Sequence, residues 1–180
     1  CGEADRGAVT AAGGGGPPMR GFERSLPIAL LRAREATMRL FKPSVDAAGL
    51  TLPQWRVIRA LAEGGVADAA ELAERCAILP PSLSRIIAAL EERGMIARDR
   101  AEEDGRRLSL RLTERGAALF KSIAPKSEAV YLTLESRFGA ARLAALLGEL
   151  EALREAAETL GEATDGRKGS PDASKPAEKP

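Results

Sequence analysis

The chain has 180 residues, a formal net charge of +1 and an aromatic fraction of 3%. This length suits one domain of ordinary size, whose core must be filled mainly by Leu, Ala and Ile. No apolar run approaches the roughly 18 residues that a membrane-spanning helix needs, so we expect a cytoplasmic protein without membrane association. Histidine is absent and the two cysteines are far apart. The sequence therefore predicts neither a metal nor a cofactor, and an enzyme is the weakest functional class.

Residues 1–24 contain the run GGGGPP and predict a disordered N-terminal extension. The chain begins at Cys1, which would suit a processed lipoprotein. Residues 1–22, however, lack the charged start and the apolar segment of a signal peptide. We therefore expect an upstream truncation or an alternative start at Met19.

The first predicted helix begins near Ser25, because apolar residues recur at three-to-four spacing from Leu26 to Phe41. Pro43 should kink or end this helix, since its ring removes a hydrogen-bond donor and crowds the preceding turn. A short helical continuation is expected up to Gly49.

Three shorter helices follow, and two of them have clear N-terminal caps. Thr51 and the Gln three residues later form a capping box for a helix over about 52–62. Asp68 repeats the arrangement for a short helix over 68–76. A Pro-Pro pair then opens a helix over 80–94, which ends in a glycine.

A two-stranded hairpin is predicted next, with strands over 95–100 and 107–112 and its tip at 103–106. Residues 108–112 alternate strictly between Leu and polar residues, so the leucines should face the core. The tip contains Asp-Gly, a common hairpin turn.

Two long helices complete the predicted fold. Thr113 caps a helix that runs to about Ser136, and a leucine-rich helix spans about 140–160. Residues 161–180 are rich in Pro, Lys, Asp and Gly and are expected to form a disordered tail.

A short helix, a tight turn, a second helix and a basic hairpin together predict a winged helix-turn-helix that reads DNA. The first turns of the second helix meet base edges in the major groove of such readers. The candidate contacts there are Pro81, Ser82, Ser84 and Arg85. Arg85 could bind guanine O6 and N7 with two hydrogen bonds. The alternative is an amphipathic core helix with a solvated Arg85; the neighbouring helix and hairpin favour DNA contact.

The hairpin offers a second set of DNA contacts. Asp104 could hold the Arg106 side chain so that it enters a narrow minor groove, which attracts arginine. Arg107 and, on the first strand, Arg98 would contact the backbone. The alternative is an exposed tip with weak, screened ion pairs. Residues 75–126 carry 11 basic and 7 acidic side chains, and this local excess favours a phosphate-binding face.

The order and spacing of these motifs resemble those of the MarR family of bacterial transcriptional regulators. The matching runs are LTLPQW at 50–55, PPSLSRII, EERGMI, Asp104-x-Arg106 and LTERG at 112–116. The runs SLPIALLRAREATMRLFKP, QWRVIRALAE and ELAERCAILPPSL are similar to those of family members that regulate homoprotocatechuate (4-hydroxyphenylacetate) degradation. The resemblance covers about residues 25–160. The tip departs from the family, because Glu102, Glu103 and Gly105 replace a more basic or Pro-containing run.

The resemblance implies a mainly α fold with a small antiparallel β-wing, dimeric through its terminal helices. Residues 25–50 would form an N-terminal dimerisation helix, 51–116 the winged helix-turn-helix and 117–160 the C-terminal dimerisation helices. Arg85 and Arg106 would take the major-groove and minor-groove roles. A two-fold homodimer implies a pseudo-palindromic double-stranded operator with half-sites about one helical turn apart. The leucine-rich last helix could instead belong to a purely intramolecular core.

The resemblance also implies a small aromatic carboxylate or phenolic effector that releases a repressor from its operator. Trp55 could form a flat wall of the effector site, with Arg34 (or Arg32) and Arg56 pairing with the carboxylate. Trp55 could equally be a structural plug between domains.

Two other functions remain open at this stage. The first is a redox-sensing repressor of the same family acting through Cys76, although an internal cysteine on an apolar helix face is more often an inert core residue. The second is a winged-helix interaction module without a DNA role, which the basic 75–126 segment disfavours.

Overall fold

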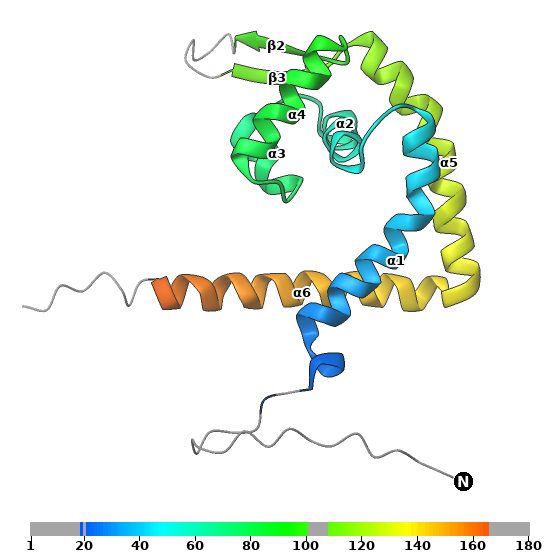
Figure 1. Cartoon of the computed structure of the whole chain (residues 1–180), viewed down its shortest axis with the longest axis vertical. Helices are drawn as coiled ribbons and strands as arrows, with labels where there is room; N and C mark the ends of the chain where they lie inside the picture. The colour runs from blue at the N-terminus through cyan, green and yellow to red at the C-terminus, as the bar shows by residue number, and fades with distance from the viewer. Residues whose placement is uncertain (1–18, 20, 101–107, 166–180) are drawn as a thin grey trace, which may run out of the picture. The chain divides into compact units, whose positions relative to one another are not determined.

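The computed structural model describes residues 19, 21–100 and 108–165. These residues form a mostly helical structure with three short strands (Figure 1). The chain divides into two units, residues 1–40 and residues 41–180, and each is treated by itself below. Within the described ranges no helix has the length and apolarity to cross a membrane.

The first unit contains a 3-10 helix, η1 (Phe22–Arg24), and most of helix α1 (Leu26–Ala47). Helix η1 lies at the end of the segment predicted to be disordered. Pro43 was predicted to kink or end the first helix; it does not end it, because α1 continues through Pro43 to Ala47, where a helical continuation was expected. Val45, beyond the proline, is fully buried, and its burial offsets the roughly 3 kcal/mol that an internal proline costs.

The second unit is organised around helix α2 (Leu52–Gly64). Figure 1 shows α2 lying between the helix pair α3 (Ala69–Arg75) and α4 (Pro80–Glu92) on one side and helix α5 (Glu114–Phe138) on the other. The predicted capping box is confirmed, since the Thr51 and Gln54 side chains each accept from the other's backbone N–H. Asp68 likewise accepts from the Glu71 backbone N–H at 2.8 Å.

The sheet has three antiparallel strands in the order β1-β3-β2. They are β1 (Ala67–Asp68), β2 (Ile96–Arg100) and β3 (Leu108–Leu112). The two long strands agree with the predicted hairpin. Strand β1 was not predicted, because two residues carry no periodicity and their pairing depends on β3. Leu110 is buried and Arg111 is exposed, as the alternation predicted.

Helix α5 begins against the base of the wing. The Thr113 hydroxyl caps it by accepting from the Gly116 backbone N–H at 3.1 Å, and donates to the carbonyl of Gly94 at 2.7 Å. Gly116 is buried, and a Cβ added there would lie 2.0 Å from the Met95 carbonyl oxygen. Helix α6 (Ala140–Asp165) follows a turn at Gly139 and extends past its predicted end near Leu160.

We predict that Gly116→Ala destabilises the protein by about 1–3 kcal/mol or more, because the new methyl group overlaps a fixed backbone atom. The free energy of unfolding from urea denaturation measures this. Gly148→Ala in α6 is the matched control, since a Cβ at Gly148 meets nothing within 4 Å and should stabilise the helix by up to about 1 kcal/mol. Equal effects of the two substitutions would contradict the close approach at Gly116.

Candidate nucleic-acid interface

The turn between α3 and α4 is held by backbone hydrogen bonds and by one arginine of α2. The Ile78 backbone N–H donates to the Ala73 carbonyl at 2.9 Å, which closes the end of α3. Ala77 has a φ of 47°, a left-handed conformation that a non-glycine residue adopts only at some cost. Arg56 Nη1 donates to the Cys76 carbonyl at 2.5 Å. The conformation of the chain just before α4 is therefore stabilised by a residue of α2, outside the turn itself.

Helix α4 has one buried and one exposed face. Leu83, Ile87 and Leu90 are at most 3% exposed and pack in the core of the second unit. The opposite face carries the residues predicted to contact DNA in this helix, and all of them are exposed: Pro81, Ser82, Ser84 and Arg85. A helix anchored along one side and polar along the other can lie in the major groove.

The polar groups on this face are available for a new partner. Ser84 Oγ donates to the Pro80 carbonyl at 3.0 Å, and Arg85 Nε donates to the Pro81 carbonyl at 3.4 Å. Both bonds are local contacts within the helix, and the second is long. The remaining donors of the Arg85 guanidinium have no partner among the described residues, so base or phosphate atoms could engage them.

Arg98 connects the wing to the helix-turn-helix. Its guanidinium lies 2.8 Å from the Glu91 carboxylate near the end of α4. In the strand register Arg98 pairs with Leu110, on the face of the sheet that meets the core. The structure thus gives Arg98 a bracing contact in addition to its predicted role at the DNA backbone.

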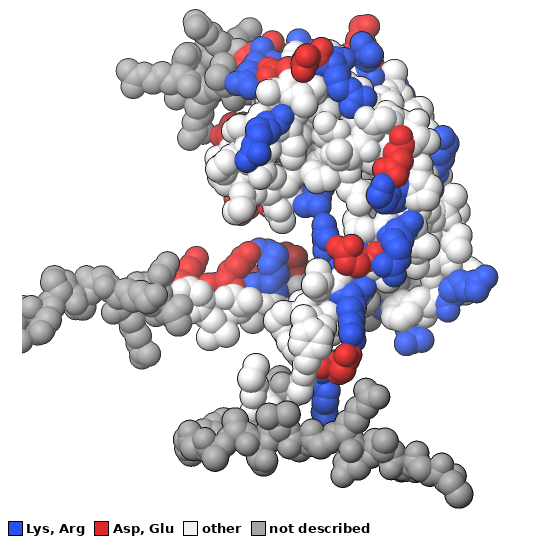
Figure 2. All heavy atoms as spheres, in the orientation of Figure 1, with Lys and Arg blue, Asp and Glu red and all other residues white. Residues whose placement is uncertain are grey.

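The opposite face of the wing carries a second ion pair, between Arg111 of β3 and Asp99 of β2. Figure 2 shows basic and acidic side chains interspersed at this end of the second unit. Arg111 is a surface cation that the sequence reasoning did not single out. The predicted contacts Asp104, Arg106 and Arg107 lie outside the described residues.

The predicted effector residues fall into three different surroundings. Trp55 is 7% exposed and stacks on Phe120 of α5, with ring centroids 5.7 Å apart. Arg56 donates instead to the end of α3. In the first unit, Arg32 pairs with Glu23 and Arg34 pairs with Glu35.

Sequence reasoning missed a more suggestive arrangement one turn beyond Trp55. Arg59 is half-buried, forms an ion pair with Glu63 at 2.7 Å, and contacts the Tyr131 hydroxyl at 3.4 Å. Its guanidinium carbon lies 5.9 Å from the centre of the Tyr131 ring. The hydrogen bond to Glu63 and then the one to Tyr131 raise the pKa of Arg59 above its ordinary value, so its charge is permanent.

An aromatic wall extends from this arginine. The rings of Phe41 and Tyr131 pack with centroids 5.1 Å apart at a tilted angle. Trp55 and Arg59 are four residues apart and thus share a face of α2. The i, i+4 spacing of a Trp and an Arg was the available signal, but the partner Tyr131 lies 72 residues away in sequence.

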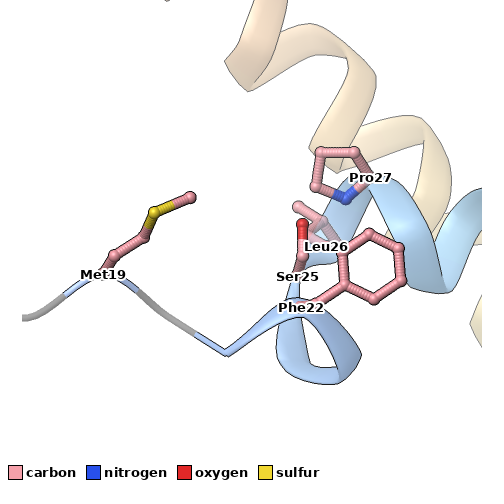
Figure 3. Close-up of a pocket in the computed structure, with 5 residues that line it drawn as sticks. All are labelled: Met19, Phe22, Ser25, Leu26 and Pro27. Carbon is pink, nitrogen blue, oxygen red and sulfur yellow. The ribbon is translucent and has the colours of Figure 1, made fainter. Parts of the chain in front are cut away.

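The first unit contains an apolar hollow of about 510 Å³. Figure 3 shows Phe22, Ser25, Leu26 and Pro27 on one side and Met19 across from them. Neither Arg32 nor Arg34 is among the described residues that line it. Among the described lining residues, the Ser25 hydroxyl is the polar side-chain group and none carries a positive charge that could bind a carboxylate.

Comparisons with known proteins agree with this architecture. A model of the MarR family matches residues 48–107, which include α2, the helix-turn-helix and strand β2. The HTH-type transcriptional regulator FarR of Neisseria gonorrhoeae is 37% identical over 142 residues, which are 77% of this chain and 97% of that protein. The chain belongs to the MarR family. It is thus a winged-helix transcriptional regulator and not an enzyme.

Two further relatives of this MarR-family chain have names that mention an aromatic acid. The homoprotocatechuate degradative operon repressor of Escherichia coli is 41% identical over 127 residues, which are 71% of this chain and 86% of that protein. The crystal structure of NadR in complex with 4-hydroxyphenylacetate has 36% identity and a TM-score of 0.68, and the match covers 76% of this chain and 97% of that one. The resemblance stated from the sequence is confirmed.

Cys76 lies at the centre of the helix-turn-helix of this MarR-family chain. It is 1% exposed, and its thiol contacts the Arg56 carbonyl at 3.8 Å. Burial raises the pKa of the Cys76 thiol, and the positive charges of Arg56 and Arg75 oppose this shift without cancelling it. A protonated, covered thiol is a poor nucleophile.

We predict that Cys76 in a Cys1→Ser variant reacts with a thiol reagent much more slowly than a free thiol at pH 7, and that the rate climbs only at higher pH. Because the folded-state pKa is raised, the contribution of this group to stability is present below the unfolded-state pKa and is lost as pH rises through the folded-state pKa. Operator release by peroxide in wild type but not in Cys76→Ser would instead support the redox-sensing alternative.

Proposed function

We propose that this MarR-family protein is a homodimeric repressor that acts in the cytoplasm on a pseudo-palindromic operator and is released by a small aromatic carboxylate or phenolic effector. The observation that carries the DNA-binding part is the exposed polar face of α4, which is held by a buried apolar face and braced by the wing through Arg98 and Glu91. Relatives described as repressors support the proposal that this protein represses transcription and does not activate it.

Exposed apolar side chains on α6 support a dimer. Leu146, Leu147 and Leu150 are 43%, 58% and 37% exposed, and large exposed apolar patches mark interaction surfaces. Helix α1 carries further exposed leucines in the first unit, including Leu30 and Leu31. A second copy of the chain, contacting both terminal regions, would cover these residues and set the distance between two α4 helices.

The effector site is proposed beside Arg59 and Tyr131, with Trp55 and Phe41 supplying aromatic surface. An arginine among aromatic rings matches a ligand that combines a ring with a carboxylate. A phenolic group could exchange hydrogen bonds with the Tyr131 hydroxyl. The ligand carboxylate would compete with Glu63 for Arg59, and that pair is exposed enough to be replaced at little cost.

This location also suggests how the signal reaches DNA. Helix α2 contacts α5 on one side and the helix-turn-helix on the other, and Arg56 ties it to the turn before α4. A ligand between α2 and α5 that favours one spacing would bias the positions of the two reading helices in the dimer. Arg32 and Arg34 stay as candidates from the first helix, while Arg56 already has a structural partner.

We predict that Arg85→Ala weakens binding to an operator selected from random DNA by about 1–3 kcal/mol and relaxes sequence preference at one base pair per half-site. Arg106→Ala should weaken binding and flatten its salt dependence. Fluorescence anisotropy over a range of salt concentrations measures both effects.

Arg137→Ala is the charge-matched control for these variants, because Arg137 is an exposed cation in the last turn of α5. Its operator affinity should stay close to that of wild type. The DNA-binding proposal fails if wild type selects no sequence, or if Arg85→Ala and Arg137→Ala bind alike.

We predict that 4-hydroxyphenylacetate changes the emission of Trp55, the single tryptophan of the chain, in a saturable way and raises the melting temperature. Arg59→Gln should weaken this binding by roughly tenfold or more, the value of a lost charged hydrogen bond. Tyr131→Phe should weaken it by a few-fold.

Arg32→Ala and Arg34→Ala decide between the two locations. A loss of binding in these variants with Arg59→Gln unchanged would move the effector site to the first helix. If no aromatic carboxylate affects wild type, the effector proposal is wrong while the DNA-binding proposal stands.

A further inference from the structure

A second hollow, of about 390 Å³, lies where α2, the wing and α5 meet. The end of α2 and its turn form one wall, the end of β3 a second, and the first turns of α5 a third. The described residues that line it are Leu61, Ala62, Gly65, Val66, Arg111, Leu112, Ala117, Phe120 and Lys121. This volume falls in the range of small-molecule sites.

The chemistry of the lining is mostly apolar with two cations. Leu61, Leu112 and Phe120 supply apolar surface, and Val66 in the turn after α2 is 58% exposed. Arg111 and Lys121 are the charged residues of the described lining, and both are positive. The lining therefore complements a molecule with an apolar body and a single negative group.

Both cations can accept a new anion without a large penalty. Lys121 is exposed and has no hydrogen-bond or ion-pair partner among the described residues. Arg111 pairs with Asp99, but both side chains are 48% exposed, and such surface pairs contribute about 0–1 kcal/mol. A ligand carboxylate could replace Asp99 or share the Arg111 guanidinium with it.

The hollow also connects two functional parts of the molecule. The Arg111–Asp99 pair links β3 to β2, so an anion on Arg111 acts directly on the wing. Phe120 lines the hollow and also stacks on Trp55 at an interplanar angle of 22°. A ligand here would thus contact the wing on one side and the Trp55–Phe120 stack on the other.

We propose that this hollow is a second ligand site, separate from the one beside Arg59, and that it takes a small apolar carboxylate. Arg111 and Lys121 hold the carboxylate, while Leu61, Leu112 and Phe120 cover the apolar body. Occupation loosens the cross-strand pair of the wing. The two sites can be tested separately, because they have no cation in common.

The test uses 2-naphthoate as the probe and the full-length chain in the Arg59→Gln background, which removes the cation of the proposed effector site. Calorimetric titration measures affinity, and amide chemical shifts in NMR spectra locate the bound probe. We expect binding to persist in this background, with shift changes centred on Val66, Ala117 and Lys121. Lys121→Glu should then weaken binding by roughly tenfold or more, as expected for replacing an attractive charge by a repulsive one.

Lys126→Glu is the matched control, since Lys126 is an exposed lysine of the same helix that does not line the hollow. It should bind the probe like the background protein. Ala117→Leu, which fills the hollow without changing charge, should also abolish binding. The proposal is overturned if no binding remains in the Arg59→Gln background, if the shifts map elsewhere, or if Lys121→Glu and Lys126→Glu behave alike.

Discussion

Helix α2 has a different partner on each of its faces, and this constraint positions the rest of the second unit. Val57 and Ile58 are fully buried in the core. Trp55 stacks on α5, and Arg56 reaches the end of α3. Successive residues of an α-helix point about 100° apart, so consecutive side chains of α2 contact different neighbouring elements. A shift of α2 toward one neighbour must disturb the others, because a close-packed interior has no free volume to absorb it.

This arrangement would give the proposed repressor a physical route between its proposed ligand sites and DNA. Phe120 connects the two proposed sites, since it stacks on Trp55 of the effector site and lines the hollow by the wing. A ligand at either site would act on the position of this ring. The two ligands would then influence each other's affinity equally in both directions, as thermodynamic linkage requires. The wing and α4, joined by Arg98 and Glu91, would respond together.

The sequence predicted those features whose causes lie within a few residues. Caps such as Thr51 and Asp68 fixed where helices begin, and the Leu-polar alternation identified β3. Local sequence left open whether the helix ends at Pro43 and resumes or runs through it, because the unbroken course of α1 depends on the burial of Val45 in the core. The pairing of Arg59 with Tyr131 was missed for the same kind of reason, since it exists only once α2 and α5 are packed. The sequence identified charged residues that are candidates for binding sites, but it did not identify the residues with which they form hydrogen bonds or ion pairs.

The close approach of Gly116 to the Met95 carbonyl has a genetic consequence. Every amino-acid replacement at a glycine codon adds at least a Cβ atom, so each missense change at this position places an atom where the wing base already is. A screen for mutants that fail to repress should therefore recover position 116 together with positions in α4. Such mutations would abolish repression by lowering the amount of folded protein in the cell. The loss of repression would be the same for every operator and every inducer tested.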